Sequence, residues 1–281
     1  MTLELSLLQT VAGGLDHPEG IAYARDGHLY ASGEGGQVYR ISIENKTAQQ
    51  FASTGGFGLG IAIDHQSNLY VCDMGVHAVV RVRPDGSTST YATGTADNPL
   101  QVPNYPVFDE RGNLYVSDSR GWGQKNGLIY RFTPSGEAQV WCTTASGYTN
   151  GMALSLDRSH LYVVESIPAR ISRVPIRADG SAGVVELVVE LPKTVPDGIA
   201  FDERGNLYIS CYSPDRIYRY TAAGLLEILF DDWSRISLNA PTNVAFAGQD
   251  LERMAISSLG GYSIAWAEVG ARGSRLCYPT L

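Results

Sequence analysis

Polar residues that could bind a metal ion recur at one position of a repeated sequence pattern. That position lies four residues before the apolar residue that ends the first segment of each copy, and its occupants are Glu19, Leu59, Asn104, Asn150, Asp197 and Thr242. Two carboxylates and two amide carbonyls offer only oxygen donors, and their joint charge of −2 suits a hard divalent cation. We therefore predict that Glu19, Asn104, Asn150 and Asp197 bind Ca²⁺, with Mg²⁺ or Mn²⁺ as alternatives.

Two other interpretations compete with a Ca²⁺ site. Zinc is disfavoured because no Cys shares the position, and His17 lies near it in only one copy. Any one of the four residues alone would be better explained as a turn former or a group that holds water. Four of them in one register favour a cation, because unpaired carboxylates that face each other repel.

The pattern itself is an internal repeat with a period of 40 to 47 residues. Each copy joins an apolar segment to a second segment, such as Leu114-Tyr-Val-Ser, through a short turn of Asp, Gly and Asn. Two further segments follow, for example Leu128-Ile-Tyr-Arg-Phe and Gly136-Glu-Ala-Gln-Val-Trp. The copies begin near Gly20, Gly60, Tyr105, Gly151, Gly198 and Asn243.

Four short strands in each of six repeats are typical of a β-propeller. We predict an all-β fold, a single six-bladed β-propeller domain over residues 1–281 with four-stranded antiparallel blades. The segment 5–12 resembles a fourth strand but precedes the first repeat. This N-terminal strand is expected to complete the sixth blade and close the ring, which removes a free sheet edge.

The predicted blades would gather the candidate ligands on one face of the disc. The first strands line the axis, and their starts share a face with the loops between second and third strands, of which residues 118–126 form the longest. The residues predicted to bind substrate on this face are Phe57, Met74, Tyr105, Asp118, Arg120, Trp122, Tyr148 and Tyr212. Two of them have other possible roles: Arg120 could form a surface ion pair, and Trp122 could pack within its own loop.

Composition narrows the expected partners. The 29 acidic residues exceed the 21 basic ones, for a net charge of −8, which disfavours nucleic acid and anionic membranes. No apolar run approaches the roughly 18 residues that span a bilayer, and the first residues do not resemble a signal peptide. We expect a cytoplasmic monomer or small homo-oligomer that binds a small molecule. The cysteines lack metal-type spacing and are expected to be free thiols: Cys72, Cys142, Cys211 and Cys277.

Short motifs surround the four predicted ligands: His17-Pro-Glu-Gly20, Pro103-Asn104, Thr149-Asn150-Gly-Met-Ala and Pro196-Asp197-Gly-Ile-Ala. They resemble the SMP-30/gluconolactonase/luciferin-regenerating-enzyme family of six-bladed β-propeller hydrolases, and the resemblance spans the chain. The order Glu, Asn, Asn, Asp is also similar to the calcium ligands of diisopropyl-fluorophosphatases and paraoxonases. The resemblance implies a lactonase or esterase in which the cation polarises the carbonyl group and Asp197 acts as general base or nucleophile.

The sequence departs from the sugar-lactone members of that family. Gluconolactonases tend to carry an Arg-x-Asn-Asp stretch where this chain has Val102-Pro103-Asn104-Tyr105, which favours a less polar lactone or ester. The histidine pair of paraoxonases has no evident counterpart. Two other functions stay open: an NHL-like propeller that only binds a partner, and a propeller enzyme with non-hydrolytic chemistry. Strictosidine synthases would exemplify the latter, since they share the fold but not the ligand set.

Overall fold

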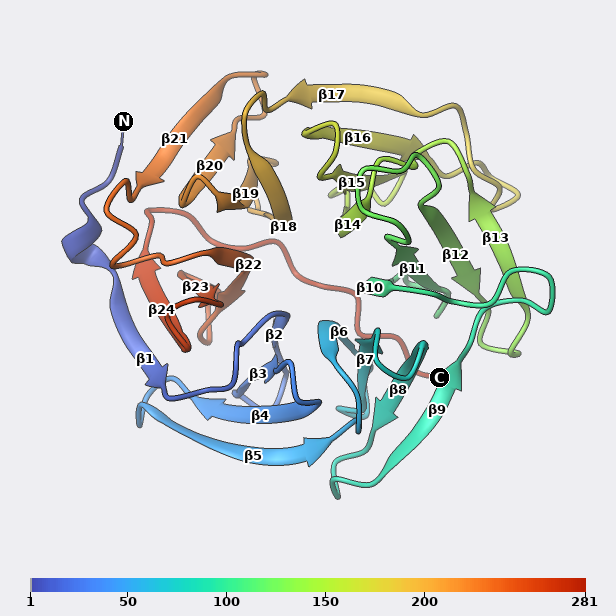
Figure 1. The fold of residues 1–281 in the computed structure, drawn as a ribbon, viewed down its shortest axis with the longest axis horizontal. Coiled ribbons are helices and arrows are strands. Elements are labelled where there is room, and N and C mark those ends of the chain that lie inside the picture. Colours follow the sequence, from blue (N-terminus) through green and yellow to red (C-terminus); the bar gives the residue numbers. More distant parts are fainter. Residues whose placement is uncertain (1) are drawn as a thin grey trace.

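Six four-stranded antiparallel sheets surround a central axis, so the predicted six-bladed propeller is confirmed (Figure 1). The computed structural model describes residues 2–281, and Met1, which the predicted domain includes, lies outside the described residues. Five blades use four consecutive strands, in order from the axis outward. The sixth blade combines the last three strands with the first strand of the chain, in the order β22-β23-β24-β1 from the axis outward.

The strands of the first three blades have the following bounds. The first blade contains β2 (Ile21–Tyr23), β3 (Leu29–Ser32), β4 (Gln37–Ser42) and β5 (Thr47–Ser53). The second contains β6 (Gly58–Ile63), β7 (Leu69–Asp73), β8 (Ala78–Val82) and β9 (Thr88–Ala92). The third contains β10 (Pro103–Phe108), β11 (Leu114–Asp118), β12 (Leu128–Phe132) and β13 (Ala138–Cys142).

The remaining blades follow the same plan. The fourth contains β14 (Thr149–Leu154), β15 (His160–Glu165), β16 (Arg170–Pro175) and β17 (Glu186–Glu190). The fifth contains β18 (Val195–Phe201), β19 (Leu207–Ser213), β20 (Arg216–Tyr220) and β21 (Leu226–Asp231). The sixth contains β22 (Pro241–Ala247), β23 (Arg253–Ser258), β24 (Ser263–Glu268) and β1 (Gln9–Gly13).

The N-terminal strand closes the ring, as predicted, but it is shorter than the predicted 5–12. β1 pairs antiparallel with β24, with Gln9 opposite Trp266. Leu5–Leu7 form a 3₁₀ turn instead. Leu5 and Leu8 pack against the apolar cluster between the fifth and sixth blades, so this segment is held by side-chain burial rather than by ladder pairing. Within residues 2–281 this turn is the sole helix, and none is long enough to cross a membrane.

Short polar turns and interblade aromatic contacts shape each blade. In the β10–β11 turn, Asp109 Oδ1 accepts the backbone N–H groups of Arg111 and Asn113, both at 2.9 Å. Gly112 completes this turn with a φ of +82°, a region in which a side chain is strained. At three interblade contacts, a second-strand tyrosine packs edge-on against the first-strand aromatic residue of the next blade, as in Tyr208 and Phe246. These tyrosines therefore build the frame.

The C-terminal segment 270–281 crosses one end of the central channel (Figure 1). The backbone N–H of Ser274 donates to the Phe201 carbonyl at 2.9 Å, and the Tyr278 hydroxyl donates to the Tyr23 carbonyl at 2.7 Å. Both acceptors end first strands, so the segment lies opposite the ends that carry the predicted ligands. An apolar cavity of about 90 Å³ lies between this segment and the first strands.

Candidate active site

The predicted ligands occupy the same end of the first strands around the axis. Asn104, Asn150 and Asp197 lie near the starts of β10, β14 and β18, and Glu19 just precedes β2. The ladder is interrupted by a β-bulge beside each of the three strand ligands. Bulges re-aim side chains and are frequent next to active sites. A Cβ on Gly151 would lie 2.5 Å from the Asp197 carbonyl oxygen, so neighbouring ligand segments are in close contact.

The two carboxyl groups are buried close to each other. Burial raises the pKa of Glu19 to about 7, with a smaller increase from the charge of Glu34 and an opposing hydrogen bond from Thr242. Burial also raises the pKa of Asp197 well above its usual value; the charge of Glu19 adds to this increase, and a hydrogen bond from Asn150 opposes it. Removal from water therefore disfavours both charges, and their mutual repulsion adds to the cost.

These residues fit a hard cation. The Oε2 atom of Glu19 is enclosed and lacks a hydrogen-bond partner, which is costly for a buried carboxylate oxygen. A divalent cation between the two carboxyl groups would satisfy that oxygen and reverse the effect of burial on both pKa values. No group of three or more His, Cys, Asp and Glu side chains forms among residues 2–281. A metal here would consequently need the amide oxygens of Asn104 and Asn150.

The two asparagine amides are oriented by serine hydroxyls. Asn104 and Asn150 are each 7% exposed. The Nδ2 atom of Asn104 lies 3.0 Å from the Ser119 hydroxyl oxygen, and that of Asn150 lies 3.4 Å from the Ser166 hydroxyl oxygen. These serines are not among the site residues predicted from the sequence. A signal was available, since each directly follows the acidic residue that ends a second strand, in Asp118-Ser119 and Glu165-Ser166.

An aromatic pair connects the buried carboxyl groups to the surface. Tyr148 packs edge-on against Trp122, with ring centroids 4.7 Å apart. Burial raises the pKa of Tyr148, and the charges of Asp197 and Glu19 raise it further, so this phenol lies within their electrostatic reach. Trp122 is 57% exposed. The two rings thus form an aromatic contact that includes one exposed side chain and one phenol near the acidic centre, and their role in substrate binding stays a prediction.

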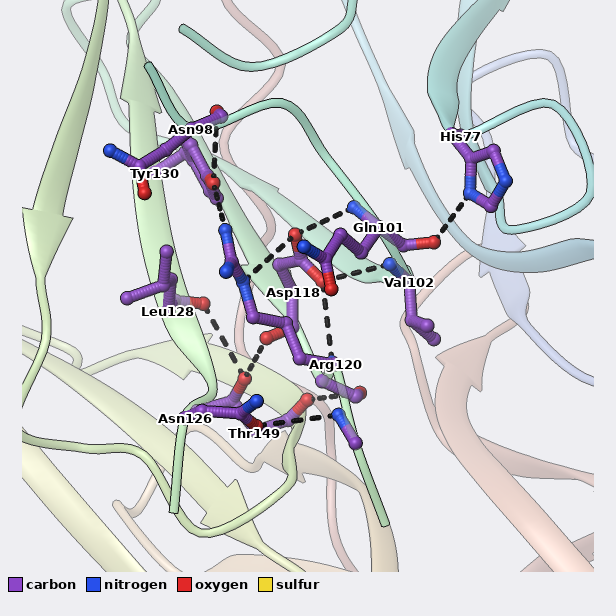
Figure 2. Close-up of polar contacts among 12 residues, drawn as sticks. His77, Asn98, Gln101, Val102, Asp118, Arg120, Asn126, Leu128, Tyr130 and Thr149 are labelled. Carbon is purple, nitrogen blue, oxygen red and sulfur yellow. Dashed lines mark hydrogen bonds and ion pairs between the residues drawn. The ribbon is translucent and has the colours of Figure 1, made fainter. Parts of the chain in front are cut away.

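Asp118, at the end of β11, and Arg120, in the loop that follows, contact residues outside that loop (Figure 2). The Asp118 carboxylate is fully buried and accepts the backbone N–H groups of Gln101 and Val102 at 2.9 and 2.8 Å. The Arg120 guanidinium donates to the Tyr130 hydroxyl at 3.1 Å and lies 3.8 Å from the Asp118 carboxylate. Both side chains therefore fix the loop, and a direct role in substrate binding stays a prediction.

The other predicted pocket residues differ in position. Tyr105 lines the apolar cavity beneath the ligands, and a hydrogen bond with Asn243 opposes the effect of burial, which raises its pKa to about 12. Phe57 and Met74 pack against the cluster between the second and third blades and are partly buried. Tyr212 is 39% exposed at the end of β19. Their substrate contacts also stay predictions.

A polar group that the sequence analysis did not connect lies beside Glu19. His17 Nδ1 is 2.8 Å from Asp16 Oδ1 and 3.6 Å from Glu34 Oε2. The His17 ring packs edge-on against Tyr262, with centroids 4.5 Å apart. No residue spacing predicts this arrangement, because its members come from three loops that only the closed ring brings together.

The protein is a six-bladed β-propeller in which two buried acids and two asparagine amides lie at one end of the central channel. The model of the SMP-30/gluconolactonase/LRE-like region matches residues 17–260 of the sequence. This match covers most of the chain, so the chain belongs to the SMP-30/gluconolactonase/LRE-like family. The resemblance noted from the motifs is thereby confirmed.

Individual relatives are distant. The chain is 24% identical to lactonase drp35 of Staphylococcus saprophyticus over 218 residues, which are 73% of this chain and 67% of that protein. It is 27% identical to protein strictosidine synthase-like 6 of Arabidopsis thaliana over 216 residues, 70% of this chain and 57% of that protein. The matched region thus spans only about two thirds or less of these relatives.

Solved structures share the fold over nearly the whole chain. A gluconolactonase from Xanthomonas campestris superposes with a TM-score of 0.80 at 22% identity, covering 95% of this chain and 89% of that one. Regucalcin, a calcium-binding protein from Agrobacterium tumefaciens, superposes with a TM-score of 0.80 at 17% identity, covering 96% of each chain. At these identities the likeness concerns the fold.

Proposed function

We propose that this protein is a metal-dependent hydrolase of the lactonase and esterase type. The observation that carries the proposal is the pair of buried carboxyl groups, Glu19 and Asp197, beside the oriented amides of Asn104 and Asn150. Family membership supports a lactonase-type enzyme, since lactonase drp35 and a gluconolactonase are among the similar proteins. The calcium-binding protein regucalcin supports a divalent cation at the site.

In the proposed reaction, Glu19, Asn104, Asn150 and Asp197 hold Ca²⁺ or another divalent cation. When bound, such a cation stabilises negative charge on the carbonyl oxygen of a lactone or ester. Asp197 accepts the proton of an attacking water molecule, whose oxygen forms a bond to the carbonyl carbon. The bond from that carbon to the ring oxygen then breaks, and the departing oxygen takes up the proton to give a hydroxy acid.

Residues around the acidic centre would determine which substrates the protein prefers. The contacting rings of Trp122 and Tyr148 would form an aromatic wall there. The Arg120 guanidinium, which could have recognised a charged substrate, already donates to Tyr130 and faces Asp118. The engaged guanidinium disfavours a charged substrate group. The preference for a less polar lactone or ester over a sugar-acid lactone rests on the residues 102–105 and stays a prediction. We keep the cytoplasmic location as a prediction.

One relative favours a second function. The chain is 27% identical to a strictosidine synthase-like protein and 24% identical to lactonase drp35. A propeller enzyme with non-hydrolytic chemistry is therefore the alternative. The two functions make different demands on the acidic centre. Hydrolysis through a cation requires Glu19 and Asp197 together, whereas a cation-free condensation does not. An NHL-like binding propeller would require neither.

The test is a lactone and aryl-ester panel assayed with the purified protein. We expect hydrolysis that a chelator abolishes and added Ca²⁺ restores, and that Asp197→Asn removes. Asp179→Asn is the matched control, because Asp179 is an exposed carboxylate that only caps its own turn at Ser181. Hydrolysis that persists after chelation would contradict the metal-dependent mechanism. A panel with no hydrolysed member, assayed with metal present, would favour the alternatives.

A further inference from the structure

Two serines connect three of the four proposed ligands in consecutive blades. The Ser119 hydroxyl donates its hydrogen to the Thr149 carbonyl oxygen at 2.5 Å. The same oxygen lies 3.0 Å from the Asn104 Nδ2 atom. A serine hydroxyl has one hydrogen, so once it has donated to a carbonyl it can only accept from another neighbour. The Asn104 amide must therefore present its NH₂ group to Ser119.

The next blade repeats this arrangement. The Ser166 hydroxyl donates to the Pro196 carbonyl oxygen at 2.7 Å and lies 3.4 Å from the Asn150 Nδ2 atom. Its single hydrogen is likewise committed to a backbone carbonyl, so Asn150 also presents its NH₂ group. Ser119 and Ser166 are 0% and 1% exposed, so neither hydroxyl faces bulk solvent.

Each serine acts on two ligands at once. Ser119 fixes the amide of Asn104 and the backbone just before Asn150, because Thr149 precedes that residue. Ser166 fixes the amide of Asn150 and the backbone just before Asp197, because Pro196 precedes it. One N–H of each NH₂ group is directed to a serine, and the second N–H of Asn150 is available for its hydrogen bond to Asp197. The amide oxygen is then the atom that can bind a cation. Without a serine acceptor, an amide is free to rotate and present its NH₂ group, which cannot bind a metal.

We infer that Ser119 and Ser166 are positioning residues for the cation: together they turn both asparagine oxygens inward and set the spacing between consecutive ligands. This inference rests on the proposed function, since it requires a metal at Glu19, Asn104, Asn150 and Asp197. Other seam serines do not contact an asparagine amide: Ser257 bonds the Thr242 hydroxyl and the Glu19 carbonyl, and others bond backbone groups. Ser210, for example, donates to the Thr242 carbonyl and accepts from the Gly198 N–H.

The test compares Ca²⁺ affinity in Ser119→Ala and Ser166→Ala with that of the wild-type protein by titration calorimetry. We expect about 10- to 100-fold weaker binding in each, the usual effect of removing a partner that orients a metal ligand. The matched control is Ser258→Ala. Ser258 is 2% exposed and donates to the Leu238 carbonyl, but it contacts none of the four ligands. The control should bind Ca²⁺ as the wild type does.

A second measurement separates positioning from a general loss of stability. The melting temperature without metal should fall by a similar amount in Ser166→Ala and Ser258→Ala, while the increase on adding Ca²⁺ should shrink only in Ser166→Ala. If Ser119→Ala does not fold, the Ser166→Ala comparison decides the question, because both serines make the same pair of bonds.

The outcomes distinguish the two proposals. If wild-type protein binds Ca²⁺ and both serine variants bind it within about twofold, the positioning role is wrong and the metal site stands. If wild-type protein binds neither Ca²⁺ nor Mg²⁺ nor Mn²⁺, the proposed metal site fails and the positioning role fails with it. A selective loss of affinity in Ser119→Ala and Ser166→Ala supports both.

Discussion

Burial raises the pKa of Asp197, and the charge of Glu19 raises it further, although the two residues belong to the fifth and first blades. A folded protein ordinarily separates like charges, and here burial adds to the cost of each. A cation bound between the two carboxylates would explain this arrangement. It would relieve their repulsion, and that relief would contribute to the free energy of cation binding.

Replacement of Asp197 by Asn should abolish turnover without loss of the fold. The amide keeps an oxygen near the axis but cannot accept the proton of an attacking water, so kcat should fall by about 10²- to 10⁴-fold. Removing one of two repelling carboxylates should leave the metal-free melting temperature unchanged or raised. Steady-state kinetics and thermal unfolding check both points. Wild-type turnover in this variant would exclude Asp197 as the base.

Calcium should stabilise the native state. Binding at about 100 times the dissociation constant adds about 2.7 kcal/mol to the free energy of unfolding. For a domain of this size that corresponds to an increase in Tm of roughly 5 °C or more. Calorimetric scans with a chelator and with added Ca²⁺ measure the shift. Glu19→Gln should reduce it strongly, because this change removes a charged oxygen ligand, and an equal shift in that variant would place the ion elsewhere.

Loss of the exposed ring of Trp122 should weaken substrate binding selectively. Trp122→Ala removes the edge-on partner of Tyr148, an interaction of the kind worth about 0.5–1.5 kcal/mol. For an aryl ester, KM should rise about 2- to 10-fold with little change in kcat. Leu225→Ala is the control, since Leu225 is 63% exposed in the β20–β21 turn, at the opposite end of the fifth blade from the predicted ligands. An equal effect in the two variants would contradict the proposed aromatic wall.

Acid should weaken the fold through Glu165. Burial raises its pKa, but the hydrogen bonds from Arg170, Ser172 and the Gly147 N–H outweigh burial and bring the pKa below its usual value. A carboxyl group with a depressed folded-state pKa contributes stability above its unfolded pKa, and this contribution is lost as the pH falls through the lower folded value.

The test of that pH dependence is Arg170→Gln, which removes a guanidinium held at 2.5 and 2.9 Å from the Glu165 oxygens. The variant should have a lower Tm than the wild type at pH 7, and the difference should shrink toward pH 3 as Glu165 becomes protonated. Thermal unfolding across this range measures the difference. A difference that is constant with pH would show that the charge of Glu165 is not involved.

Much of the fold could be predicted from the sequence because a propeller is built from a local repeat. Turn residues such as Gly112 and second-strand residues such as Tyr208 recur at fixed positions, and each repeat folds into one blade by contacts between neighbouring strands. Ring closure by the N-terminal strand followed from counting strands. Its start did not, because burial of Leu5 and Leu8 against neighbouring blades, rather than the apolar pattern, decides where pairing begins.

The sequence by itself determined which residues share a register, and so indicated Glu19, Asn104, Asn150 and Asp197 as a set. Only the tertiary structure decided how their atoms are presented. The elevated pKa values depend on burial beneath a closed ring, and the orientation of each amide depends on a serine hydrogen that is donated to the backbone of the next blade. Such contacts join residues of different repeats, so no spacing along the chain encodes them. Arg120 is a similar case. The sequence predicted that it lies near the site, but only the structure shows its hydrogen bond to Tyr130 and its ion pair with Asp118.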